Sequence, residues 1–134
     1  MSIDTITVAS LRLLALIFTA IALTCLVDPR LLLEAMEVGL ETPSALAEAR
    51  AGYSGTFLGL ALLCATGAQR AEARRLALGV VVLVLGIFTL ARILSWLIDG
   101  EPNLAAMVNH GLEGVGFFFA LVLWVKGGGA PAEG

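Results

Sequence analysis

The residues that could do chemistry in this sequence are a few ionisable and hydroxyl side chains set within otherwise apolar stretches. A charged side chain in the middle of a membrane helix costs on the order of 2.5–3.5 kcal/mol on insertion scales, so such residues are usually paired and are functional candidates. An arginine guanidinium binds phosphate or carboxylate through a planar fork of N–H donors, and a carboxylate, imidazole or phenol can move a proton. The candidate members of a ligand-binding site or buried polar network are Glu48, Arg50, Tyr53, Arg92, Ser95, Asp99, His110 and Glu113.

Helical spacing groups several of these residues on common faces. Ser95 and Asp99 follow Arg92 at i+3 and i+7, and His110 and Glu113 are three residues apart. Arg92 lies roughly 7–8 Å inside one end of its apolar stretch, at 1.5 Å per residue. Because the helix ends that carry these candidates are expected on one side of the membrane, a bundle could bring the side chains together.

Charge complementarity predicts specific pairs among these groups. The sequence favours Arg92 with Glu113, and Arg50 with either Glu48 or Asp99. Such pairs could form a binding site, or they could simply hold helices together. Arg50 and Asp99 could also extend their charged ends to water at the membrane surface. The sequence leaves these alternatives open.

A metal or cofactor site is not expected. A zinc site needs three or four ligands. His110, Glu113 and Glu48 would supply only the minimum of three, and two of these are carboxylates. His110 is better interpreted as a hydrogen-bonded packing residue. Cys25 and Cys64 each lie inside an apolar stretch and are interpreted as buried packing residues. There is no phosphate-binding glycine loop, nucleophile elbow or paired-cysteine redox motif.

Composition indicates what must position these groups. The 134-residue chain is 59% hydrophobic and 14% charged, whereas soluble proteins are about one quarter charged. Four stretches reach the roughly 20 apolar residues that cross a bilayer. The sequence therefore predicts an all-α membrane protein, a four-transmembrane-helix bundle in one domain over residues 1–126, followed by a flexible Gly-rich tail at 127–134. The expected helices cover about residues 8–27, 43–66, 76–98 and 103–126.

The ends of these helices carry their own signals. Thr42 followed by Pro43 is typical of a helix start, and Asn103 is a good N-cap for the last helix. Thr24 is large for the position before Cys25 in a lipoprotein cleavage site, so we expect the first stretch to be retained as a membrane helix.

The longest loop, residues 30–41, carries an amphipathic pattern. Glu34, Glu37 and Glu41 fall at i, i+3 and i+7, which predicts a short interfacial helix between helices 1 and 2. This helix could serve only as a cover for the bundle or could take part in ligand entry. The apolar residues on its other side are Leu32, Leu33, Met36 and Leu40.

Basic residues predict the orientation. Arg70, Arg74 and Arg75 lie between the second and third helices, and Arg12 and Lys126 lie toward the same side. The opposite loops are mainly acidic. Since cytoplasmic loops are enriched in Lys and Arg, both termini are expected to be cytoplasmic. The net charge of −3 argues against nucleic acid as a partner.

The charged positions also resemble a known family. Residues 48–55 follow the pattern E-x-R-A-x-Y-x-G, and Gly86, Arg92 and Ser95 follow G-x5-R-x-x-S. A D-G-x-P stretch begins at Asp99, and Glu113 matches an acidic position. The chain thereby resembles the small bacterial four-helix membrane protein family named domain of unknown function 4345. The resemblance implies a bacterial inner-membrane protein, supplies no established activity, and does not extend to His110.

Three functions are compatible with this pattern. The first is a binding or accessory protein whose outward-facing polar pocket takes an anionic lipid headgroup or small molecule, with Arg50 and Arg92 as its anion ligands. The second is a structural subunit of a larger membrane complex. The third, ranked last, is an enzyme that transfers a proton on a lipid-soluble substrate, with Glu113 as base, His110 or Tyr53 as acid and Arg92 stabilising negative charge. The lipid bilayer is the expected surrounding, and a homo-oligomer is a further possibility.

Overall fold

The computed structural model describes residues 2–127, and every regular element within them is helical. The predicted tail covers residues 127–134; Gly127 is the last residue of α6, and residues 128–134 lie outside the described residues. The elements are α1 (Ile3–Val27), α2 (Arg30–Leu33), the 3₁₀ turn η1 (Glu34–Met36), α3 (Pro43–Ala49), the π turn η2 (Arg50–Ser54), α4 (Gly55–Gln69), α5 (Ala71–Asp99) and α6 (Leu104–Gly127).

Four of the described helical segments are long and apolar enough to cross a membrane, which confirms the predicted fold class. They are α1, the continuous segment Pro43–Gln69 that joins α3, η2 and α4, and then α5 and α6. The helices extend a few residues beyond the predicted apolar windows, because the hydrogen-bonded ends continue into polar sequence. The predicted caps are confirmed: Ala45 N–H donates to Thr42 Oγ1 at 3.1 Å and Ala106 N–H donates to Asn103 Oδ1 at 2.9 Å.

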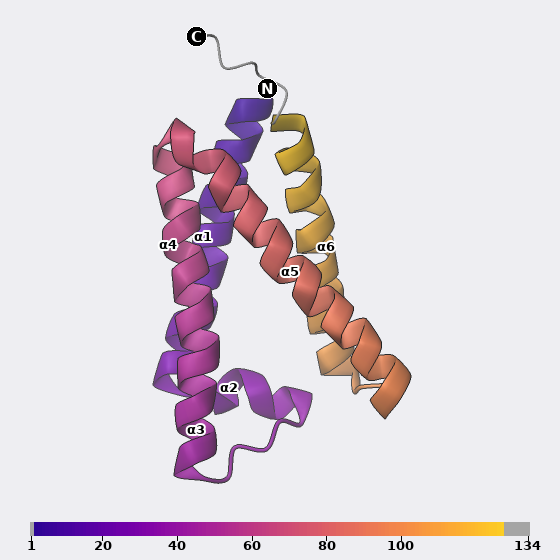
Figure 1. The fold of residues 1–134 in the computed structure, drawn as a ribbon. Coiled ribbons are helices and arrows are strands. Elements are labelled where there is room, and N and C mark those ends of the chain that lie inside the picture. The colour runs from indigo at the N-terminus through magenta and orange to yellow at the C-terminus, as the bar shows by residue number, and fades with distance from the viewer. Residues whose placement is uncertain (1, 128–134) are drawn as a thin grey trace.

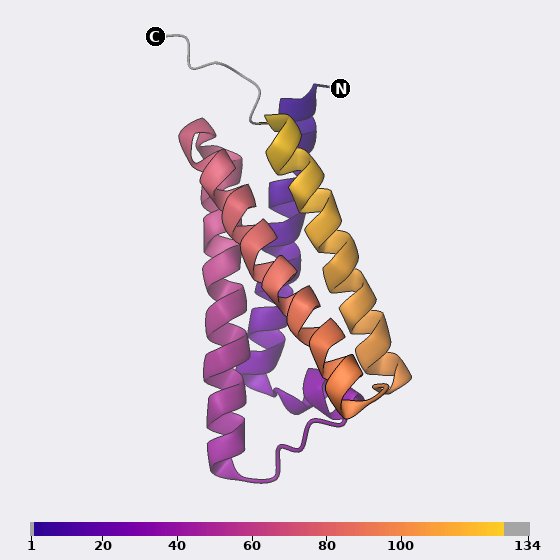
Figure 2. The same ribbon diagram turned by 45° about the vertical axis from the view of Figure 1, so that its right-hand side comes forward.

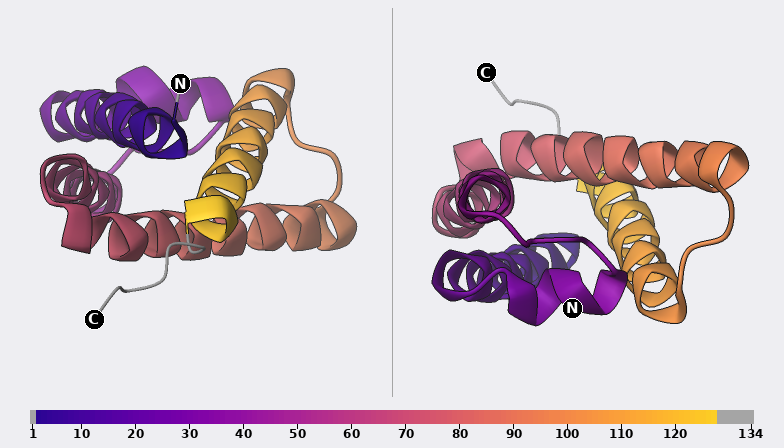
Figure 3. Two further views of the ribbon diagram at one scale, coloured as in Figure 1. Left: turned by 90° about the horizontal axis from the view of Figure 1, so that it is seen from above. Right: turned by 90° about the horizontal axis from the view of Figure 1, so that it is seen from below.

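The spans pack as two pairs that meet at a short turn. Helix α1 packs along α4, and α5 packs along α6 (Figure 1). Helices α4 and α5 lie close together at the turn near Arg70 and diverge toward the other end (Figure 2). Viewed along the bundle, α1 and α4 lie to one side and α6 crosses over α5 (Figure 3). The bundle is therefore tight at one end and splayed at the other.

Small residues explain the close packing at the tight end. A Cβ placed on Gly67 would lie 2.7 Å from the Ala77 Cβ and 3.2 Å from Leu11 Cδ1, so α1, α4 and α5 can meet only because glycine stands there. Around this point Leu11, Ala77 and Val81 are completely buried. Close packing of small and apolar side chains therefore brings the helices together in this half of the bundle.

A cap segment, residues 30–41, covers the splayed end. Its Leu33 and Leu40 are buried against Ala49 of α3, and Glu34, Glu37 and Glu41 are exposed, as the amphipathic pattern predicted. Asn103 Nδ2 donates to the Ala35 carbonyl oxygen at 3.1 Å and fastens the segment to the start of α6.

The helix in this cap segment is short. It ends at Met36 because Glu37 adopts a left-handed conformation, with φ 60°, and Val38 N–H then donates back to the Leu33 carbonyl oxygen at 3.1 Å. This is the usual way in which a helix ends on a left-handed residue. A short helix therefore lies between the first two spans, as predicted, and it occupies the first half of the segment.

The first and last described helices, α1 and α6, have their outer ends at the tight end. The start of α1, the end of α6 and the α4–α5 turn with Arg70 are together there, and the cap segment and the α5–α6 turn are at the opposite end (Figure 1). We call these the terminal end and the capped end. Which of the two faces the cytoplasm stays a prediction.

Candidate functional site

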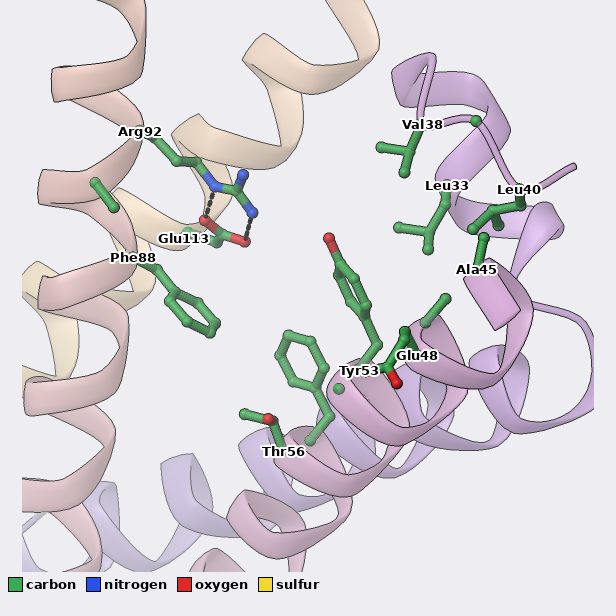
Figure 4. A pocket seen from close by; sticks show the side chains of 15 residues that line it. Leu33, Val38, Leu40, Ala45, Glu48, Tyr53, Thr56, Phe88, Arg92 and Glu113 are labelled. Carbon is green, nitrogen blue, oxygen red and sulfur yellow. Dashed lines mark hydrogen bonds and ion pairs between the residues drawn. The ribbon is translucent and has the colours of Figure 1, made fainter. Parts of the chain in front are cut away.

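A cleft of about 600 Å³ lies at the capped end, between the second span and the α5–α6 pair. The cap segment covers it with Leu33, Val38 and Leu40, and the side chains from the other elements face them across the space (Figure 4). The volume is in the range that holds a small organic ligand. Its lining residues are Leu33, Val38, Gly39, Leu40, Ala45, Glu48, Ala49, Gly52, Tyr53, Thr56, Phe57, Phe88, Ala91, Arg92 and Glu113.

Arg92 and Glu113 form the polar centre of the cleft. Arg92 Nε donates to Glu113 Oε2 at 2.6 Å and Nη2 donates to Oε1 at 3.0 Å, which confirms the predicted pairing. The side chains are 28% and 11% exposed. Asn109 Nδ2 donates to Oε1 at 3.1 Å, so both carboxylate oxygens have partners. Two parallel charge-assisted bonds fix the guanidinium plane against the carboxylate.

Tyr53 lies opposite this pair. It stands in the π turn η2, and its hydroxyl points across the cleft toward Arg92 and Glu113 (Figure 4). Its ring stacks on Phe57 with centroids 6.4 Å apart. In the part of the chain that the structure describes, no hydrogen bond joins the Tyr53 hydroxyl to another group. A π turn takes up an extra residue within a helix and is often found at functional sites.

Glu48 and Arg50, one turn earlier, lie in different places. Glu48 is exposed and lines the cleft from α3. Arg50 lies outside the lining, and its Nε donates to the Leu26 carbonyl oxygen at 3.2 Å. This carbonyl is in the last turn of α1, where intrahelical donors are lacking. Arg50 therefore binds the end of α1, and neither predicted ion pair, with Glu48 or with Asp99, is among the salt bridges of the described residues.

Ser95, Asp99 and His110 also lie outside the cleft. Ser95 Oγ donates to Asp99 Oδ2 at 2.8 Å within α5. Trp96 Nε1 donates to His110 Nδ1 at 3.1 Å, and the two rings are 5.6 Å apart. His110 thus joins α5 to α6 as a hydrogen-bonded packing residue. Across residues 2–127, no three His, Cys, Asp or Glu side chains gather in a group that could hold a metal ion.

Sequence reasoning missed the apolar walls of the cleft and the role of Asn109. Phe57, Phe88 and Val38 line the space, and nothing in their local spacing sets them apart from core residues. Asn109 had a usable signal, because it precedes Glu113 by four residues and so lies on the same helical face.

Comparisons with known proteins give one match, to a family model. No curated protein and no solved structure matches the chain. One family model, described as Domain of unknown function (DUF4345), matches residues 6–125. This stretch includes all but the first residues of α1 and the last residues of α6, and it includes all the residues of the cleft. The chain therefore belongs to the DUF4345 family of proteins of unknown function.

Proposed function

We propose that this protein is a binding or accessory protein of the bacterial inner membrane and that its cleft holds the polar end of an amphiphile. The observation that carries the proposal is the position of the Arg92–Glu113 pair, inside a cleft of about 600 Å³ whose remaining walls are mostly apolar. An ion pair that serves only to join α5 and α6 does not require a cleft beside it. The sidedness expected from Arg70, Arg74 and Arg75 would place the cleft on the outer side of the membrane.

The charges of the lining specify the kind of polar group that fits. The lining contains two carboxylates, Glu48 and Glu113, and one guanidinium, Arg92. Arg50, which the sequence offered as a second anion ligand, binds the end of α1 instead. The charge of the cleft therefore does not favour an anionic head group, and a neutral head that both accepts and donates hydrogen bonds fits better.

The available hydrogen-bonding groups support this choice. A guanidinium has five N–H donors, and Arg92 uses two of them on Glu113. The Tyr53 hydroxyl supplies one further donor and acceptor from the opposite wall. A carbonyl, hydroxyl or amide head could bind between them while its hydrocarbon part lies along Phe57, Phe88 and Leu33.

Proton-transfer catalysis fits this geometry less well. Both carboxylate oxygens of Glu113 already accept hydrogen bonds from Arg92 or Asn109, so this carboxylate is engaged with donors of the protein itself. His110 is engaged with Trp96 outside the cleft lining. Of the two expected proton donors, His110 and Tyr53, Tyr53 alone lines the cleft. A binding role therefore accounts for more of the observed contacts.

The test is native mass spectrometry of the protein extracted gently from its own membrane, alongside Arg92→Ala and Arg50→Ala. Both variants remove one arginine from the capped end, and only Arg92 lines the cleft. A bound molecule that is lost in Arg92→Ala and kept in Arg50→Ala supports the proposal. A bound second polypeptide, unaffected by either variant, would instead make the chain a subunit of a larger complex.

A further inference from the structure

A second hollow, of about 530 Å³, lies at the terminal end, away from the cleft. Three helices line it. Helix α1 contributes Asp4, α5 contributes Arg74 and Arg75, and α6 contributes Trp124 and Lys126. The lining holds three basic side chains and one carboxylate, so its charge is opposite in sign to that of the cleft. We call it the basic hollow.

The Arg74 guanidinium is only partly matched by a carboxylate. Arg74 Nη1 donates to Asp4 Oδ1, and this is a single contact on one oxygen. Arg74 Nε is buried and has no hydrogen-bond partner among the described residues. At the other end of the bundle, Arg92 donates from both Nε and Nη2, one bond to each oxygen of the Glu113 carboxylate. Arg74 makes only one such bond to Asp4. An oxyanion beside Arg74 would complete a similar match.

The hollow lies where the polar head groups of a bilayer are found. Helix α5 has 29 residues and is thus about 43 Å long at 1.5 Å per residue, whereas the hydrocarbon core of a bilayer is roughly 30 Å thick. Part of α5 therefore extends beyond the hydrocarbon, and the charged first turns, with Arg74 and Arg75, favour that position. Trp124, near the end of α6, lies under Arg75 with the guanidinium carbon 5.8 Å from the ring centroid. Tryptophan is enriched at the depth of the lipid head groups.

We infer that the basic hollow binds the phosphate head group of an anionic phospholipid. The phosphate would lie among Arg74, Arg75 and Lys126, and the acyl chains would run beside the apolar part of the lining, Ile3 and Leu78. Basic pockets between membrane helices are known to take such head groups. The inference is independent of the ligand proposed for the cleft, because the two sites have no lining residue in common.

The test uses Trp124 as a reporter. The chain has two tryptophans, so Trp96→Phe leaves Trp124 alone, and Trp96 is at the capped end. The purified Trp96→Phe protein in detergent micelles is titrated with phosphatidylglycerol, with phosphatidylcholine and with inorganic phosphate while the Trp124 emission is followed. Phosphatidylglycerol should shift the emission in a saturable way at concentrations where the other two do not.

Matched variants separate a site from general charge attraction. Arg75→Gln/Lys126→Gln and Arg12→Gln/Arg70→Gln each remove two positive charges, and only the first pair lines the hollow. The first should weaken phosphatidylglycerol binding by about fivefold for each charge removed, and the second should leave it nearly unchanged. Lys126→Gln alone, at the exposed end of α6, gives a single-site version that leaves the helix contacts intact.

Three results would overturn the inference. Equal weakening in the two double variants would show attraction to surface charge without a site. An equal response to phosphatidylcholine would show that the lipid binds through its chains. An equal response to inorganic phosphate would make the ligand a free anion rather than a lipid.

Discussion

The Arg92 guanidinium and the Glu113 carboxylate meet through two parallel hydrogen bonds, of 2.6 and 3.0 Å, that join α5 to α6 beside an open space. The pair lies seven residues before the end of α5, about 10 Å at 1.5 Å per residue. At this depth each charge alone would be costly, and the pairing removes most of that cost. The same two side chains thus hold the helices together and give the cleft its polar centre, and variants can separate the two roles.

The first prediction separates packing from binding at this pair. Arg92→Met alone should destabilise the protein by up to about 3 kcal/mol, because the largely buried Glu113 carboxylate loses its counter-charge. The double variant Arg92→Met/Glu113→Leu should recover most of this loss, since a well-packed apolar pair often replaces an ion pair at little cost. Unfolding in detergent, followed by circular dichroism, measures both. A double variant that is no more stable than Arg92→Met would contradict the interpretation.

A second prediction concerns the Tyr53 hydroxyl. Tyr53→Phe should leave stability unchanged, because this hydroxyl has no hydrogen-bond partner in the described residues and the ring can still stack on Phe57. Ligand retention should fall by about threefold to tenfold, the value of one hydrogen bond. The bound fraction in native mass spectra checks this. Unchanged retention would remove Tyr53 from the site.

Glycine substitutions test the helix packing that opens the cleft. A Cβ at Gly86 would lie 2.9 Å from the Phe117 ring, so Gly86→Ala should force α5 and α6 apart and cost about 1–3 kcal/mol. A Cβ at Gly114 would meet nothing within 4 Å, and Gly114→Ala should be neutral or slightly stabilising. Thermal unfolding of the two variants side by side is the measurement. Similar midpoints would mean that the α5–α6 contact is looser than the structure shows.

The proposed sidedness can be tested by labelling single cysteines. Cys25 and Cys64 are completely buried and should not react. A membrane-impermeant maleimide should label Glu37→Cys, in the exposed cap segment, on intact spheroplasts, and should label Arg70→Cys only after lysis. The reverse pattern would place the cleft on the cytoplasmic side and would contradict the proposed orientation.

The sequence predicted the scaffold well because the physical signals for it are local. Runs of apolar residues defined the spans, and Thr42 and Asn103 marked the starts of two helices. The Arg92–Glu113 pair could also be predicted. Two opposite charges at similar depth in adjacent helices are expected to pair, because an unpaired charge in the membrane is costly.

The remaining contacts depended on geometry that no local signal contains. Arg50 was expected to pair with a carboxylate, but η2 places it beside the unsatisfied end of α1, where it binds Leu26. The left-handed Glu37 shortened the cap helix although glutamate rarely adopts this conformation. The cleft itself results from the splay of the two helix pairs, which appears only when all four spans are packed.

The most direct test of the central claim is native mass spectrometry of the gently extracted wild-type protein beside Arg92→Met/Glu113→Leu. This double variant should keep the α5–α6 contact, and it removes the ion pair that forms the polar centre of the cleft. The account predicts a bound small molecule or lipid on the wild-type chain and its loss from the double variant, with stability nearly unchanged. The same molecule bound equally to both proteins would show that the pair is only a scaffold and that the cleft does not recognise a polar head.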